Sequence, residues 1–271
     1  MKTGLANRID ARFSELRAKQ RTGLIPFITA GDPVPGATVA VMHALVETGA
    51  DVIELGVPFS DPMADGSTIQ HAGERALVKG IGIEQILQWV RAFRGRDMST
   101  PIVLMGYLNP IEIFRIERFA REAKDAGVDG VLIVDCPLEE SAELQSLRDA
   151  GLRCILLAAP TTSDARLADL SAAAEGYLYY VSFAGITGAS NLDVGEVERR
   201  VTSLRASCEV PIAVGFGIKD AASAKAISAF ADAVVIGSAL VDRLAGSANG
   251  DEARARAEDF LAPIRAALDK H

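Results

Sequence analysis

Cysteine, histidine and tryptophan are scarce in this chain of 271 residues, which holds three cysteines, three histidines and one tryptophan. The cysteines, Cys136, Cys154 and Cys208, are odd in number and widely spaced, and no CxxC pair or Cys/His cluster occurs. Neither a disulfide framework nor a zinc site is therefore predicted. We expect the cysteines to be small buried side chains and the chain to bind no metal.

Long apolar runs and an excess of positive charge are also missing. No stretch approaches the about 20 apolar residues of a membrane span, and residues 1–20 hold acidic side chains and no hydrophobic run, unlike a signal peptide. The formal net charge of -8 and the isoelectric point near 5.0 argue against nucleic acid or an anionic membrane as the main partner. We expect a cytoplasmic protein that binds neither.

Short β-branched runs alternate with amphipathic stretches along the chain. The runs predict strands, in order, at Leu24–Thr29, Val52–Leu55, Ile102–Met105, Gly130–Val134, Cys154–Leu157, Leu178–Ser182, Ile212–Val214 and Ala233–Ile236. The stretches predict helices at Ala37–Thr48, Ile69–Val78, Ile83–Phe93, Ile111–Ala126, Glu139–Ala150, Asp164–Ala174, Val194–Ala206, Ala221–Ala231 and Asp251–Lys270. Three helix ends share an Ala-Gly or Thr-Gly step whose glycine suits the left-handed conformation after a helix: Gly49, Gly127 and Gly151.

Eight strand–helix units favour an α/β fold, a (β/α)8 TIM barrel whose parallel strands are buried on both faces. We expect one domain over residues 1–271, because no linker or low-complexity tract divides the chain. An extra N-terminal helix, with Leu5, Ile9, Phe13 and Leu16 near helical period, would cover the bottom of the barrel. The alternative is a doubly wound open sheet, but no GxGxxG opens a first helix.

The run from Asp51 to Gly66, DVIELGVPFSDPMADG, carries the first candidate chemistry. Glu54 interrupts a buried strand, where a carboxylate needs partners, and a stiff loop with Asp61 and Asp65 follows. A shielded carboxyl and one nearer solvent would differ in pKa, so one could act as an acid while the other stays ionised. Alternatively, Glu54 is a structural residue paired with a buried Arg or Lys, and Asp65 a turn residue.

Glycines cluster where three consecutive strands end: Gly185 and Gly188 after strand 6, Gly215 and Gly217 after strand 7, and Gly237 with Ser238 after strand 8. In TIM barrels such loops commonly hold a phosphate through backbone N–H groups, although tight turns alone would also explain each pair. The loops at residues 56–68 and 183–193 are longer than their neighbours, which favours lids over one mouth. The sequence therefore predicts a phosphate ester as ligand.

Two further residue types bear on the reaction. Tyr179 shares a strand face with Tyr177 and Val181, and either packs in the barrel or hydrogen-bonds to an acidic loop residue. No lysine lies in any predicted strand, and neither Lys219 nor Lys225 has a strand-end position suited to a Schiff base. The sequence therefore argues against a Schiff-base aldolase.

Four phrases closely resemble the tryptophan synthase α-subunit family, and the similarity runs essentially end to end. They are Pro26-Phe-Ile-Thr-Ala-Gly-Asp-Pro33, Glu54-Leu-Gly-Val-Pro-Phe-Ser-Asp-Pro-Met-Ala-Asp-Gly66, Met105-Gly-Tyr-Leu-Asn-Pro110 and Gly215-Phe-Gly-Ile218. The resemblance implies a (β/α)8 lyase that splits indole-3-glycerol phosphate into indole and D-glyceraldehyde 3-phosphate by a retro-aldol reaction, in the last steps of L-tryptophan biosynthesis. It also implies no metal and no organic cofactor in this chain.

The resemblance also implies roles for individual residues. Glu54 matches the catalytic acid/base, and Asp65 the carboxylate that stabilises positive charge at the indole nitrogen. Tyr179 matches a tyrosine that hydrogen-bonds this aspartate, and Thr187 a loop threonine that contacts it on closure. The implied indole pocket comprises Phe27, Met105, Tyr107, Leu132 and Val134, and the implied phosphate site Gly188, Gly217, Gly237 and Ser238.

The sequence departs from some relatives at three positions. Phe183 stands where some carry an arginine in the strand-6 loop, which puts any closure contact of that charge in doubt. Met105 and Val134 replace other apolar residues, which keeps the pocket apolar.

The family's partner is a β subunit that uses pyridoxal phosphate in an α2β2 heterotetramer, and Asp61 and the Asn109-Pro110 region lie in segments that face it in relatives. The alternatives are another phosphate-binding barrel, such as an isomerase, and a non-catalytic barrel that activates a β subunit allosterically.

Overall fold

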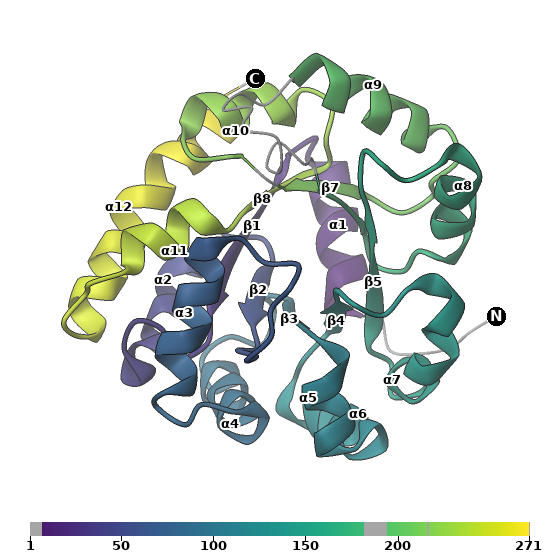
Figure 1. Cartoon of the computed structure of the whole chain (residues 1–271). Helices are drawn as coiled ribbons and strands as arrows, with labels where there is room; N and C mark the ends of the chain where they lie inside the picture. Colours follow the sequence, from purple (N-terminus) through teal and green to yellow (C-terminus); the bar gives the residue numbers. More distant parts are fainter. Residues whose placement is uncertain (1–6, 182–193, 216, 271) are drawn as a thin grey trace.

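Eight parallel strands close into a barrel in sequence order, β1 to β8, with helices around the outside (Figure 1). The computed structural model describes residues 7–181, 194–215 and 217–270. The strands are β1 Gly23–Thr29, β2 Ile53–Gly56, β3 Ile102–Gly106, β4 Gly130–Ile133, β5 Arg153–Ala158, β6 Leu178–Val181, β7 Ile212–Gly215 and β8 Ala233–Ile236. The predicted TIM barrel is confirmed, and the alternative of an open sheet is wrong.

The helices and 3-10 segments follow the predicted alternation. They are α1 Arg8–Ala18, η1 Pro35–Ala37, α2 Thr38–Glu47, α3 Ser67–Leu77, α4 Ile83–Arg94, α5 Leu108–Phe114, α6 Ile116–Ala126, η2 Leu138–Leu144, α7 Gln145–Asp149, α8 Asp164–Ala173, α9 Val194–Arg205, α10 Ala221–Ser228, α11 Ser238–Leu244 and α12 Gly250–Leu268. At the predicted helix ends Gly49, Gly127 and Gly151 have φ of 100°, 96° and 82°, the left-handed region that glycine enters at little cost.

Two predicted helices are built differently. The stretch predicted as one helix, Ile111–Ala126, is two helices, α5 and α6, because Arg115 between them has φ 73° and cannot continue a right-handed helix. The stretch Glu139–Ala150 begins as the 3-10 segment η2 and becomes α-helical only in α7. The spacing of apolar residues reports which face of a helix is buried and carries no information on the φ of one residue. The sequence pattern therefore could not predict the break at Arg115.

The barrel has two apolar layers. The larger one fills the space between strands and outer helices. The smaller one fills the barrel interior and is closed at the bottom by α1, whose Ile9, Phe13 and Leu16 pack there as predicted (Figure 1). Leu5, the fourth predicted apolar residue of this helix, lies outside the described residues. Both faces of the strands are buried and α1 covers the bottom of the barrel. The carboxyl ends of the strands therefore form the open mouth.

The described part of the chain holds no helix that is long and apolar enough to cross a membrane.

Candidate active site

Glu54 lies in β2 with its side chain inside the barrel. The parallel register places it opposite Phe27 of β1 and Val103 of β3. It is fully buried, with 0% of its surface exposed. Its Oε1 accepts a hydrogen bond of 2.6 Å from the hydroxyl of Tyr177, just before β6, whereas Oε2 has no partner among the described residues. The second oxygen is therefore available for a ligand.

The surroundings of Glu54 shift the pKa of its carboxyl toward neutrality. Burial raises the pKa of this carboxyl to about 7, and the hydrogen bond from Tyr177, which favours the charged form, partly opposes that rise. No Arg or Lys side chain of the described residues forms an ion pair with it. The described residues therefore do not support the alternative that Glu54 is a structural residue paired with a buried Arg or Lys.

A cavity of about 330 Å³ connects Glu54 with the predicted phosphate positions. Gly217 after β7 and Gly237 and Ser238 at the end of β8 line it together with Glu54 and Tyr179. Residues more than 160 positions apart in sequence thus surround one space, because parallel strands of a barrel deliver all their carboxyl ends to the same mouth. The remaining phosphate residue, Gly188, lies outside the described residues.

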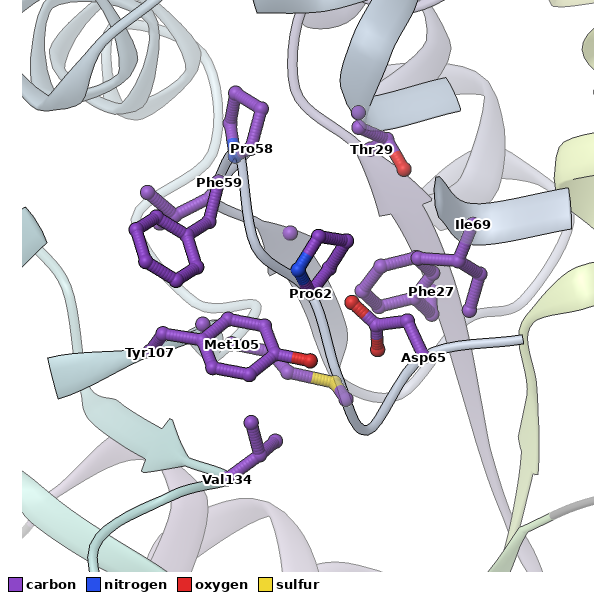
Figure 2. A pocket seen from close by; sticks show the side chains of 14 residues that line it. Phe27, Thr29, Pro58, Phe59, Pro62, Asp65, Ile69, Met105, Tyr107 and Val134 are labelled. Carbon is purple, nitrogen blue, oxygen red and sulfur yellow. The ribbon is translucent and has the colours of Figure 1, made fainter. Parts of the chain in front are cut away.

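Asp65 lies on the loop after β2, next to the hydroxyl of Tyr107. That hydroxyl accepts a hydrogen bond of 3.0 Å from the Ala64 N–H and is a hydrogen-bond partner of the Asp65 carboxyl (Figure 2). Burial raises the pKa of Asp65 to about 6, and the bond with Tyr107 partly offsets this. The Asp65 N–H also donates to Pro62 O at 3.0 Å, so this half-buried acid is part of a turn as well.

Apolar side chains surround Asp65. Phe27, Met105, Tyr107 and Val134, predicted for the indole pocket, line one small space with it, and the volume left between them is about 20 Å³ (Figure 2). Phe27 and Met105 also line the larger cavity, so the two spaces adjoin. Leu132, the fifth predicted residue, is fully buried in the barrel interior opposite Met105 and lines neither space.

Tyr179 is placed beside Glu54 and Gly215, whereas the described hydroxyl next to Asp65 is that of Tyr107. Tyr177 and Tyr179 both pack in the barrel interior and Tyr180 in the outer layer, which confirms the predicted alternation of β6. A Cβ built on Gly215 would come within 2.2 Å of the Tyr179 hydroxyl, so a glycine is needed there to make room for this ring. The predicted bond from Tyr179 to Asp65 stays a prediction.

Some predicted residues lie outside the described part of the chain, and others were not foreseen. Thr187 and Phe183 lie outside it. The bond from Tyr177 to Glu54 was not predicted, although the two-residue spacing from Tyr179 was a signal for it. Lys219, considered only as a Schiff-base residue, lines the cavity that Glu54 enters. In the described residues no group of three or more His, Cys, Asp and Glu side chains could hold a metal ion.

This arrangement suits proton transfer to or from a ligand in the adjoining spaces. Glu54 offers a carboxyl with a pKa near neutrality inside a cavity, and Asp65 offers a second carboxyl of lower pKa among apolar side chains. Gly217, Gly237 and Ser238 lie at the same cavity with room for close approach of the backbone.

Comparison with known proteins gives the family. A family model described as tryptophan synthase alpha chain matches residues 13–268. The chain is 59% identical to the tryptophan synthase alpha chain of Xylella fastidiosa (strain M12) over 97% of this chain and 98% of that relative. It is 60% identical to that of Xanthomonas euvesicatoria pv. vesicatoria (strain 85-10), over 97% and 99% of the two chains. The crystal structure of tryptophan synthase subunit alpha from Legionella pneumophila str. Paris is 42% identical, with a TM-score of 0.92 over 98% of this chain and 100% of that chain. The chain therefore belongs to the enzyme family of tryptophan synthase alpha chains.

Proposed function

We propose that this chain cleaves indole-3-glycerol phosphate to indole and D-glyceraldehyde 3-phosphate, as a lyase of L-tryptophan biosynthesis in the cytoplasm. The observation that carries the proposal is Glu54, a fully buried carboxyl with one oxygen that has no partner among the described residues and that shares a cavity with Gly217, Gly237 and Ser238. A substrate with its phosphate at these residues would extend its reacting carbons toward Glu54. Family membership supports the same substrate.

In the proposed reaction Glu54 transfers two protons. Protonated Glu54 gives its proton to C3 of the indole ring, which leaves a positive charge on the ring. The carboxylate so formed takes the proton of the hydroxyl on the carbon attached to C3. The O–H electrons form the new carbonyl of glyceraldehyde 3-phosphate, and the electrons of the breaking C–C bond return to the ring as indole leaves. Glu54 ends protonated, ready for the next cycle.

Asp65 acts on the charge that this sequence creates. We assign it to the indole N–H, where its carboxylate stabilises the positive charge of the protonated ring. Because its pKa is about 6 and that of Glu54 about 7, a window exists in which Asp65 is ionised while Glu54 still carries its proton. Proton transfer by side chains needs no metal or organic cofactor of this chain.

For indole binding, the small space around Asp65 has to enlarge. Its volume of about 20 Å³ holds about one water molecule, far less than an indole ring. We propose that Phe27, Met105, Tyr107 and Val134 move apart, or that the loop carrying Asp65 shifts, as the ring enters from the adjoining cavity. Thr187, Gly188 and Tyr179 keep their predicted roles within this proposal, and Leu132 would support the pocket from behind Met105.

We further propose a β subunit with pyridoxal phosphate as partner, in an α2β2 assembly. Support comes from two exposed apolar side chains in the segments that the family resemblance assigned to the partner. Met63, between Asp61 and Asp65, is 87% exposed, and Ile113, on α5 with Asn109 and Pro110, is 77% exposed. Covering such side chains on association is favourable. Because Val78 and Met98 are also exposed elsewhere, at 89% and 66%, the support lies in where Met63 and Ile113 stand and not in their exposure alone.

The proposed function is tested by measuring indole release from indole-3-glycerol phosphate, with and without a β subunit. We expect indole formation by the wild type and a loss of about 10²–10⁴-fold in Glu54→Gln, the usual contribution of an acid–base residue. Glu74→Gln, which removes an exposed glutamate on α3, serves as the control and should keep full activity.

The two alternative functions give different results in this assay. No indole from the wild type, even with the β subunit present, would reject the lyase and favour another phosphate-binding barrel. Activation of the β subunit together with unchanged, negligible indole release in wild type and Glu54→Gln would indicate a non-catalytic activator.

A further inference from the structure

The cavity that holds Glu54 has an unbalanced charge. Two carboxylates line it, Glu54 in β2 and Asp242 on α11, and among its described lining residues Lys219 is the one cation. A phosphate ester brings about two negative charges at neutral pH. Without Lys219 the described lining would oppose such a ligand through Asp242 and through any ionised Glu54.

Lys219 is anchored at its backbone and exposed at its side chain. It follows the turn in which Gly217 has φ 71°, and its N–H donates to Ser223 Oγ at 3.2 Å. Ser223 belongs to the capping box that begins α10, so the Lys219 backbone is tied to a helix. Its side chain is exposed and makes no ion pair with any described residue.

The nearby acids already have hydrogen-bond partners. Asp220, the next residue, accepts 2.8 Å and 2.7 Å bonds from the N–H and hydroxyl of Ser223, and it does not line this cavity. Asp242 accepts a 3.3 Å bond from Thr68 Oγ1. The bonds from Ser223, and to a smaller extent the charge of Lys219, lower the pKa of Asp220, but no described carboxylate forms an ion pair with Lys219, so its ammonium is available to a ligand. Lys219 lines the same cavity as Gly217, Gly237 and Ser238.

We propose that Lys219 is a specificity-determining residue that supplies the positive charge for the substrate's phosphate, and that it selects dianionic phosphate esters over neutral analogues. This inference rests on the proposed function for the identity of the substrate. Lys219 follows Gly217 by two residues after β7, whereas Glu54 lies in β2, which is not a neighbour of β7 in the barrel. We therefore expect Lys219 to act equally on bound substrate and transition state. Such uniform binding changes KM and leaves kcat almost unaltered.

The test compares Lys219→Gln with Lys219→Arg and with Lys19→Gln. Lys19 is exposed just after α1 at the bottom of the barrel. Lys19→Gln therefore removes the same charge as Lys219→Gln, but at the opposite end of the molecule. Two readouts are measured: steady-state cleavage of indole-3-glycerol phosphate by the assembly with its β subunit, and equilibrium binding of sn-glycerol 3-phosphate by calorimetry. Lys219→Gln should raise KM and the dissociation constant about fivefold to tenfold, the size of one charge-assisted contact that is partly exposed.

The other variants and the salt dependence make the test specific. Lys219→Arg should stay within about twofold of the wild type and Lys19→Gln should not differ from it, because only a charge at the cavity matters. Rising salt should weaken glycerol 3-phosphate binding more in the wild type than in Lys219→Gln. Wild-type binding by Lys219→Gln, or equal weakening by Lys19→Gln, would overturn the inference.

The two readouts separate failure of this inference from failure of the proposed function. If the wild type releases no indole, the lyase proposal fails, while glycerol 3-phosphate binding still decides the role of Lys219. If the wild type releases indole and Lys219→Gln retains its KM, the role of Lys219 is rejected and the lyase proposal stands.

Discussion

Two carboxylates three residues apart, Asp51 just before β2 and Glu54 within it, are buried in opposite surroundings. Asp51, just before the strand at the bottom of the barrel, is 1% exposed. It pairs with Arg21 at 2.7 Å and Arg265 at 3.2 Å, and accepts the Leu24 N–H at 2.9 Å. Glu54, toward the mouth, is 0% exposed and has only the hydroxyl of Tyr177 among the described residues. Asp51 is compensated by cations, although burial still raises the pKa of its carboxyl against their pull, whereas Glu54 has no cation beside it among the described residues.

The difference separates stability from chemistry within one strand. A compensated carboxylate holds its charge and fixes the chain, which suits the bottom of a TIM barrel, where residues act mainly on stability. An uncompensated carboxyl is destabilising when ionised, and for that reason exchanges its proton near neutrality. Asp129 repeats the bottom arrangement, since it pairs with Arg8 at 2.8 Å and Arg94 at 2.9 Å and accepts the Ile102 N–H at 2.9 Å.

The largest expected effect is the loss of the compensated carboxylate. Asp51→Ala should lower the free energy of unfolding by about 3–5 kcal/mol, because it removes the buried carboxylate partner of Arg265 and leaves the Leu24 N–H without its acceptor. Arg265 would keep the half-exposed Asp269 carboxylate and the Thr22 carbonyl. The measurement is urea denaturation near neutral pH.

The control for this variant is Asp269→Ala, since Asp269 contacts the same arginines, Arg21 at 2.9 Å and Arg265 at 2.7 Å, but is 44% exposed. It should cost less than about 1 kcal/mol. Equal losses in the two variants would show that burial at the barrel bottom is not what matters.

The second expected effect is that ionised Glu54 lowers the stability of the fold, whereas Asp51 contributes to it through its arginine partners. The pKa of its carboxyl is raised on folding from 4.5 to about 7, so its contribution to stability is full below pH 4.5 and is lost as pH rises through about 7. A shift of that size corresponds to roughly 3 kcal/mol. The unfolding free energy of Glu54→Gln minus that of the wild type should therefore increase by roughly 3 kcal/mol between about pH 4.5 and pH 8.

Urea denaturation at several pH values measures this difference. The contributions of the other titrating groups cancel in it, because both proteins contain those groups. Glu74→Gln, at an exposed position of α3, is measured in the same series as the control for removing a glutamate. A difference for Glu54→Gln that does not change with pH would mean that Glu54 is compensated in solution.

The sequence predicted the barrel and the placement of its mouth, and it failed where distant side chains meet. Apolar runs ending in glycine steps such as Asp125-Ala-Gly-Val-Asp129 mark strand and helix limits locally, so the eight units were readable. Strand order then brings Glu54, Gly217 and Gly237 to one mouth. The pairing of Asp51 with Arg265, 214 positions apart, leaves no local pattern.

The surroundings of the two acids were only partly predictable for the same reason. That Tyr107, rather than Tyr179, is the described neighbour of Asp65 depends on how the loop after β2 folds back over β3. The resemblance supplied residue roles but not these contacts. Single backbone choices, such as φ 73° at Arg115, were likewise invisible in the periodicity.

The smallest expected effect concerns the one described hydrogen bond to Glu54. Tyr177→Phe removes the hydroxyl that favours the charged carboxylate, so the pKa of Glu54 should rise further, by about one unit or less. The proposed reaction predicts a pH profile of kcat/KM for indole release whose acid limb should follow Asp65, with its pKa of about 6. The alkaline limb should follow loss of the Glu54 proton near pH 7.

Tyr177→Phe should therefore move the alkaline limb to higher pH and leave the acid limb in place, with a change in the maximal rate of no more than about tenfold. Tyr180→Phe is the matched control, because Tyr180 is equally buried, follows on the same strand and packs in the outer layer away from Glu54. A purely structural role for Tyr177 would lower activity at every pH without displacing either limb. If the alkaline limb moves in Tyr177→Phe and not in Tyr180→Phe, the pKa of Glu54 depends on a single hydroxyl. Asp51 and Asp129 at the bottom of the barrel, by contrast, are each held by at least two arginines.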